Sequence, residues 1–153
     1  MSEQITKIKV NEDLTAIVYY KENSNNTDTR EIVFKGGEKI TDEFNTAFQK
    51  SKSTFGEIIP LLKDDLHKIR MISISFEYNE VKQINKVSYN VKYTPQKGVK
   101  TEIPVKNLPI YDETIKSFTV SGKDVDLLYE ILDYANKYIK GDTRTKQMKI
   151  EVV

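Results

Sequence analysis

The stretch Ile69–Tyr78, "IRMISISFEY", alternates apolar and polar residues and constrains the fold more than any other segment of the chain. Because successive side chains of a strand point to opposite faces, the pattern predicts a strand with one buried face and one wet face. The residues expected on the buried face are Ile72, Ile74, Phe76 and Tyr78. Lys86–Tyr93 repeats the alternation after a polar connection, which predicts a β-hairpin over 69–93.

Three further strands are predicted before this hairpin. Gln4–Val10 and Leu14–Lys21 are rich in β-branched and aromatic residues, and the turn sequence "NED" separates them. Thr29–Lys35 follows a polar, Asn-rich segment and alternates in the same way. We expect Gly36-Gly37 to end this third strand. Together the three strands form a predicted β-meander over 4–35.

The segment 41–62 changes to a helical period, with apolar residues recurring every three to four positions. Thr41 or Asp42 can cap its start by accepting hydrogen bonds from free backbone N–H groups. Gly56 and Pro60 interrupt it, and proline lacks the N–H that an inner helical turn needs. The sequence therefore predicts a kink or two shorter helices.

A second helix is predicted over 121–140, bounded by Ser121 as N-cap and by Gly141 as the left-handed residue that ends it. The tail 141–153 follows. Its last residues, "MKIEVV", alternate as a strand does. This strand can pair with an edge of the chain's own sheet or with a second copy, so a homo-oligomer through the tail is left open.

Between hairpin and last helix, 94–118 contains three prolines and one glycine, which predicts an extended loop or an edge segment. The element order indicates an α+β fold, with an antiparallel sheet of about five to six strands and two main helices on one face. A length of 153 residues without a linker fits one domain, 1–153.

Composition narrows the class of function. The formal net charge is +1, which is not the global signature of a nucleic-acid or membrane-surface binder, although a local basic patch remains compatible with it. The chain has no cysteine, which excludes disulfides, thiolate catalysis and cysteine-based zinc sites. No stretch has the apolar length of a signal peptide or a membrane span. We expect no membrane association and a location in the cytosol of a host cell.

No catalytic centre or metal site is predicted, and no cofactor. His67 is the only histidine and lies in the charged stretch "KDDLHKIR", so we interpret it as a surface or boundary residue. Asp126, Glu130 and Asp133 share one helical face, opposite the apolar stripe, where solvated acids are the usual case. A hydrolase or nuclease would need converging carboxylates, for which the candidates are Asp64, Asp65 and Glu77.

Basic residues gather in the proline-rich segment and around the end of the last helix, beside several tyrosines. This combination is compatible with single-stranded nucleic acid or a small anionic ligand. The competing explanation, which we favour, is structural: cations at a helix C-terminus also stabilise the helix dipole without a ligand. The candidate binding residues are Thr94, Lys97, Lys100, Lys106, Lys140, Arg144, Lys146 and Gln147.

The ending "YIKGDTRTKQMKI" resembles the closing pattern of a family of small accessory proteins from tailed phages and prophages of low-GC bacteria, Tyr-Ile-x-Gly-x-Arg-Ala-Gln. Tyr138, Ile139 and Gly141 match it. Arg144 and Gln147 match only with inserted residues, and the alanine is missing. "FNTAFQ", "ISISFEY" and "TPQK" resemble other stretches of that family in the same order.

The resemblance implies a phage or prophage accessory protein of unassigned function, and it transfers no catalytic residue. Such genes commonly encode inhibitors of host defence or helpers of DNA metabolism. We therefore expect a non-enzymatic protein that binds a host or phage protein, or a defence-signalling molecule. The surface expected to do so joins the segment 94–106 with the tail after Gly141. The alternative is a single-stranded DNA-binding helper of phage replication or recombination.

Overall fold

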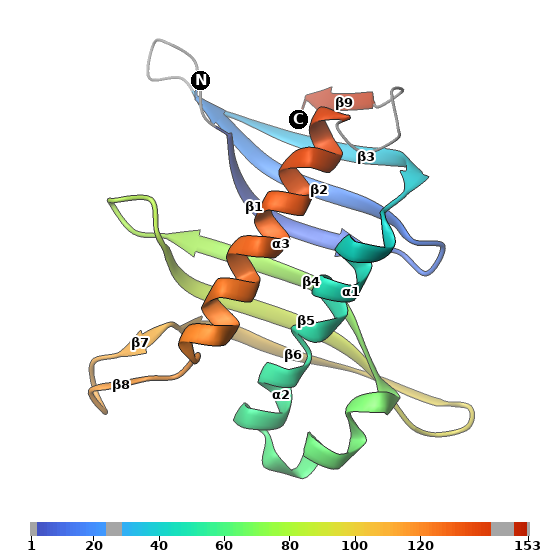
Figure 1. Cartoon of the computed structure of the whole chain (residues 1–153), viewed down its shortest axis with the longest axis vertical. Coiled ribbons are helices and arrows are strands. Elements are labelled where there is room, and N and C mark those ends of the chain that lie inside the picture. The colour runs from blue at the N-terminus through green and yellow to red at the C-terminus, as the bar shows by residue number, and fades with distance from the viewer. Residues whose placement is uncertain (1–2, 24–28, 142–148, 153) are drawn as a thin grey trace.

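A seven-stranded antiparallel sheet with helices on one of its faces makes up most of the molecule (Figure 1). The computed structural model describes residues 3–23, 29–141 and 149–152. The strands are β1 (Glu3–Val10), β2 (Thr15–Asn23), β3 (Thr29–Lys39), β4 (Ile69–Tyr78), β5 (Ile84–Gln96), β6 (Val99–Pro109) and β9 (Lys149–Val152). Their spatial order is β6-β5-β4-β1-β2-β3-β9. The predicted α+β class is confirmed.

The helices lie across one face of the sheet, and α3 runs along the length of that face (Figure 1). They are α1 (Asp42–Lys50), α2 (Ser53–Ile58), the 3₁₀ segment η1 (Pro60–Lys68) and α3 (Gly122–Lys140). A two-stranded ribbon, β7 (Tyr111–Asp112) and β8 (Ser117–Phe118), projects before α3. The opposite face of the sheet carries no helix among the described residues, and we call it the helix-free face.

The predicted helix 41–62 is divided into three pieces. The Thr41 hydroxyl accepts a hydrogen bond from the Phe44 N–H at 3.1 Å, which confirms the predicted cap. The helix is interrupted between Lys50 and Ser53, and again before Pro60. Pro60 begins η1 at a first-turn position, where a missing N–H costs nothing. The interruption predicted at Pro60 is therefore present. The one predicted at Gly56 is not, because Gly56 lies inside α2 and the other break falls between α1 and α2.

The hairpin β4–β5 has the predicted position, but its buried face differs from the prediction at one residue. The register shifts between Met71 and Ser73, which marks a β-bulge. Met71 therefore faces the core together with Ile74, and Ile72, although buried, lies outside the main core cluster. A bulge adds one residue to the strand and reverses the alternation before it, and the pattern of side chains alone does not reveal this.

Of the two structures predicted for 94–118, an extended loop or an edge segment, the edge segment is present over about half of this length. Val99–Pro109 forms β6, the edge strand, which pairs with β5 over its whole length. Proline is tolerated on an edge strand because outward N–H groups there need no partner in the sheet.

The last helix is confirmed at both ends. The Ser121 hydroxyl accepts from the Asp124 N–H at 3.2 Å, and Gly141 has a left-handed φ of 73°. The described end of the tail, β9, pairs antiparallel with β3 of the same chain. The sequence left open whether this strand pairs with the chain's own sheet or with a second copy, and the structure shows it paired with the chain's own sheet.

Gly36 does not end β3, because the strand continues through both glycines to Lys39. Its lack of a side chain serves packing instead. The fully buried ring of Tyr138 from α3 lies so close that a Cβ on Gly36 would fall 1.6 Å from the Tyr138 hydroxyl oxygen. That hydroxyl donates to the Glu38 carbonyl at 2.6 Å and accepts from the Ala16 N–H at 3.4 Å. The last turn of α3 is thereby attached to two strands.

Candidate ligand-binding face

The helix-free face collects the side chains that alternate with the core residues of each strand. Lys7 and Lys9 lie on β1, opposite Ser75 and Ser73 of β4. On the other side of β1, the same two lysines lie opposite Tyr19 and Ile17 of β2. This face therefore mixes cations, hydroxyls and a few apolar groups at its centre, where most side chains are only half exposed.

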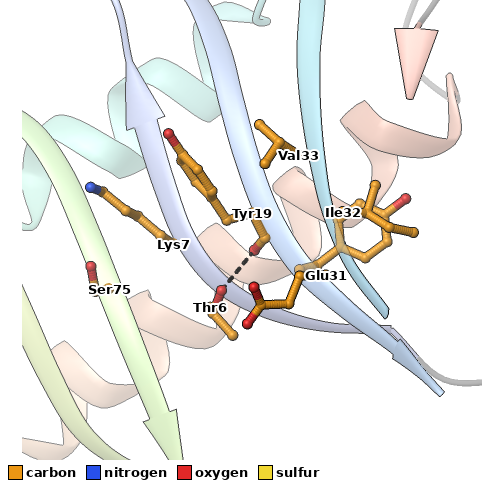
Figure 2. A pocket seen from close by; sticks show the side chains of 8 residues that line it. Thr6, Lys7, Tyr19, Glu31, Ile32, Val33 and Ser75 are labelled. Carbon is orange, nitrogen blue, oxygen red and sulfur yellow. Dashed lines mark hydrogen bonds between the residues drawn. The ribbon is translucent and has the colours of Figure 1, made fainter. Parts of the chain in front are cut away.

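A hollow of about 420 Å³ opens on this face (Figure 2). We call it the tyrosine hollow, and its lining residues are Thr6, Lys7, Tyr19, Tyr20, Glu31, Ile32, Val33 and Ser75. The Lys7 ammonium lies 5.5 Å from the centre of the Tyr19 ring, a cation–π contact. Figure 2 shows Val33 beyond Tyr19, and the Glu31 carboxylate near Thr6.

A bulge in β1 shapes the tyrosine hollow. The register with β2 shifts between Ile5 and Lys7, so that Thr6 occupies an extra position in the strand. The Thr6 hydroxyl donates to the Tyr19 carbonyl at 3.3 Å, as Figure 2 shows. Bulges redirect side chains and increase local twist, which accounts for a depression at this point of the sheet.

A second hollow, of about 300 Å³, lies where β4 begins and β5 turns into β6. We call it the basic hollow, and its lining residues are Glu12, His67, Lys68, Ile69, Arg70, Lys92, Thr94 and Lys100. Glu12 neutralises part of its charge, at 3.8 Å from the Arg70 guanidinium and 3.7 Å from the Lys92 ammonium. The remaining cations give the hollow an excess of positive charge that suits an anion.

The structure brings some of the predicted binding residues together and separates others. Thr94 and Lys100 line the basic hollow. Lys97 is exposed in the β5–β6 turn, and Lys106 is exposed on β6. Lys140 is exposed at the end of α3. The residues Arg144, Lys146 and Gln147 lie outside the described residues.

The expected surface joining segment 94–106 with the tail is wrong for the described part of the tail. β6 and β9 form opposite edges of the sheet, with five strands between them. Sequence reasoning could not foresee this separation because it depends on strand order. The basic residues of β6 therefore lie beside the side chains that the neighbouring strands place on the helix-free face.

The near-neutral net charge of +1 conceals an excess of cations on the helix-free face. The strand alternation places these cations on the helix-free face: Lys7, Lys9, Lys21, Lys35, Arg70, Lys86, Lys92, Lys100 and Lys106. The acids of that face are fewer: Glu12, Glu31, Glu77 and Glu102. The helix side carries exposed groups of both signs: the acids Asp42, Glu43, Asp126, Glu130 and Asp133, and the cations Lys50, Lys63, Lys123, Lys137 and Lys140. Net charge alone therefore does not argue against an anionic partner.

Two carboxyl groups meet on the helix side, where the sequence predicted none to converge. Asp124 of α3 is only 6% exposed, and its Oδ2 atom has no hydrogen-bond partner among the described residues. Burial, and next the hydrogen bond and charge of Asp124, raise the pKa of Glu57 above its usual range. The buried hydroxyls of Thr54 and Tyr89 lie beside them, also without well-formed hydrogen bonds.

The acids named as hydrolase candidates do not converge. Asp65 accepts a hydrogen bond from the Tyr93 hydroxyl at 2.6 Å, which lowers the pKa of its carboxyl. Glu77 lies near the other end of β4, opposite Lys86. His67 is exposed, as predicted. Within the described ranges, no group of three or more histidine and acidic side chains is arranged to hold a metal ion.

No known protein family, curated protein or solved structure matches this chain. Across residues 3–23, 29–141 and 149–152, none of the helices has the length and apolar character needed to span a bilayer. The phage-family resemblance therefore remains a prediction.

Lys7, Tyr19 and Glu31 were not among the candidate residues predicted from the sequence. The signal was present in "TKIKV" and "AIVYYK", whose alternation gives one face rich in lysine and tyrosine. What the sequence lacked was the strand order, which places β1 at the centre and makes these residues neighbours.

Proposed function

We propose that the protein is a non-enzymatic binding protein whose helix-free face binds single-stranded nucleic acid. The observation that carries this proposal is the concentration of cations on one sheet face around an accessible aromatic residue, Tyr19, which Lys7 flanks. Proteins that bind single strands without strict sequence preference combine basic surfaces that follow the backbone with aromatic side chains on which bases stack.

The dimensions of the face support this ligand. Six strands from β6 to β3 give five inter-strand spacings, a width of roughly 24 Å at about 4.8 Å per spacing. Lys9 lies between the tyrosine hollow and Arg70, so that cations connect the two hollows. A nucleic-acid strand that crosses the sheet would contact positive charge along its path and release counterions when it binds.

The experiment is a fluorescence-anisotropy titration of a labelled twelve-nucleotide oligothymidine at several salt concentrations. We expect binding that weakens as salt rises, because ion release drives it. Replacing Lys9 and Lys92 by glutamine should weaken binding roughly ten-fold and reduce the salt dependence. The matched control replaces Lys50 and Lys123, which lie on the helix side and have no ion pair among the described residues. Equal loss in both double variants, or no binding at all, contradicts the proposal.

A second candidate function is binding to a host protein, in the anti-defence role that the phage resemblance implies. The β7–β8 ribbon favours it, because Tyr111, Ile115 and Phe118 are 43%, 63% and 69% exposed. Tyr111 and Phe118 form an edge-to-face pair at 4.9 Å that stiffens the ribbon. Exposed apolar patches commonly mark protein interaction sites.

This second candidate is tested by capture from a host lysate with the unaltered protein and two variants. Serine at Ile115 and Phe118 should abolish capture of a specific protein, whereas the Lys9 and Lys92 double variant should retain it. If both variants capture the same protein equally well, its contact lies elsewhere on the surface and the ribbon has no role in binding it.

A further inference from the structure

The tyrosine hollow contains a carboxylate on a face that is otherwise rich in cations. Glu31 is exposed and lines this hollow with Lys7 and Tyr19. Lys21 lies opposite Glu31 across the β2–β3 pair, yet no ion pair joins Glu31 to any cation among the described residues. A carboxylate repels phosphate, but it can accept hydrogen bonds from the donor groups of a base.

We propose that the tyrosine hollow is a base subsite selective for guanine, an inference that rests on the proposed single-strand binding. The base packs against Tyr19 and Val33, and the Glu31 carboxylate accepts two hydrogen bonds from its Watson–Crick edge. Lys7, beside the Tyr19 ring, holds the adjoining phosphate.

The selectivity follows from the hydrogen-bonding groups of the bases. A carboxylate only accepts, and it has two oxygens that can act in parallel. Guanine presents two adjacent donors, N1–H and the exocyclic amine, which match that pair of oxygens. Thymine offers one N–H between two carbonyl oxygens, which a carboxylate repels. Adenine and cytosine place their single amine beside a ring nitrogen that accepts, so each satisfies only one oxygen.

The surroundings of Glu31 fit this role. The hollow of about 420 Å³ is large enough for a nucleobase, since ligand pockets commonly begin near 300 Å³. Thr6 and Ser75 add hydroxyl groups to its wall. Figure 2 shows Glu31 at one end of the group formed by Lys7, Tyr19 and Val33, on the side of the sheet away from the helices.

The test compares two twelve-nucleotide strands, oligothymidine and the same strand with one central guanine, with the unaltered protein and with Glu31→Gln. The guanine strand should bind the unaltered protein roughly ten-fold more tightly, as expected for a bidentate base contact. Glu31→Gln should remove that gain and leave oligothymidine affinity unchanged or slightly higher. Glu102→Gln is the matched control, because it removes an acid of the same face far from the hollow.

A second readout separates this inference from the function on which it rests. Guanosine and uridine monophosphates carry the same phosphate, so amide NMR shifts at Lys7, Tyr19 and Val33 report the base alone. If the protein binds oligothymidine and the guanine-containing strand with equal affinity, the guanine subsite is overturned and the proposed single-strand binding is retained. Shifts caused by guanosine monophosphate without any oligonucleotide binding overturn the proposed function and retain the subsite. Absence of both effects overturns both.

Discussion

Replacing Gly36 by alanine tests whether packing, and not backbone freedom, explains this glycine. The added Cβ would lie 1.6 Å from the Tyr138 hydroxyl oxygen and 2.3 Å from Cζ, so the ring must move. Overpacking a core costs about 1–3 kcal/mol. Displacing the ring also strains or breaks the hydrogen bonds to Glu38 and Ala16, each worth about 1 kcal/mol. We expect a loss of about 2–5 kcal/mol in the free energy of unfolding.

Urea denaturation followed by circular dichroism measures this loss directly. For a chain of this length, each kcal/mol lowers the melting temperature by about 2–4 °C, so thermal unfolding should show a clear decrease as well. The control is Gly37→Ala, since a Cβ at that neighbouring glycine meets no atom within 4 Å. That variant should remain within about 1 kcal/mol of the unaltered protein.

A double-mutant cycle determines whether the clash is with Tyr138. Leucine at 138 lacks the three atoms that approach position 36, so Gly36→Ala should cost little in that background. The two changes should therefore be non-additive by about 2 kcal/mol. If their costs simply add, or if Gly37→Ala is as damaging as Gly36→Ala, the packing explanation is wrong.

The remaining predictions concern ionisable groups and one helix cap. Because the pKa of Glu57 is raised in the folded state, its contribution to stability is greatest below the unfolded pKa and is lost as pH rises through the folded value. Glu57→Gln should therefore gain stability relative to the unaltered protein as pH rises above the usual range of a carboxyl group, measured by urea unfolding at several pH values, and a constant difference would contradict the raised pKa. The pKa of Asp65 is lowered, so its contribution is present above the unfolded pKa and is lost as pH falls through the folded value. Tyr93→Phe should raise the pKa of that carboxyl in an NMR titration, and an unchanged titration would show that another group lowers it. Ser121→Ala should cost about 1 kcal/mol through loss of the α3 cap, and no change in the urea midpoint would show that the cap contributes nothing.

The parts of the fold that the sequence predicted correctly depend on local interactions. Ser121 and Gly141 bound α3 because a hydroxyl cap and a left-handed residue act within a few positions of the chain. Thr41 caps α1 for the same reason. The hairpin β4–β5 was predictable because alternation extends over both strands.

The errors have non-local causes. Gly36 resembles a strand breaker, but its partner Tyr138 is about a hundred residues away in the sequence. Ile72 was assigned to the wrong face because the pairing with β5 introduces a bulge. Pro104 lies in a strand because β6 is at an edge, which only the completed sheet defines.

The candidate site divides in the same way. Thr94 and Lys100 were identified from their own basic, proline-rich segment, and both line the basic hollow. Tyr19 and Glu31 belong to neighbouring strands, and their proximity to Lys7 follows from sheet order and from the bulge at Thr6. The contact between Glu57 and Asp124 likewise joins two helices that are far apart in the sequence, α2 and α3.

The central position of β1 has a consequence for how the chain acquires its structure. β1 pairs with β2 through a tight turn, but its other neighbour, β4, pairs Ser75 with Lys7 across roughly seventy positions. Until β4 pairs with β1, the newly formed meander exposes the unpaired edge of β1 and its apolar residues to the solvent. We expect refolding to be slow for a chain of this size, and early species to be prone to aggregation at high concentration. Growth at lower temperature should then increase the yield of soluble protein, because it gives each nascent chain more time to complete the sheet before it meets another.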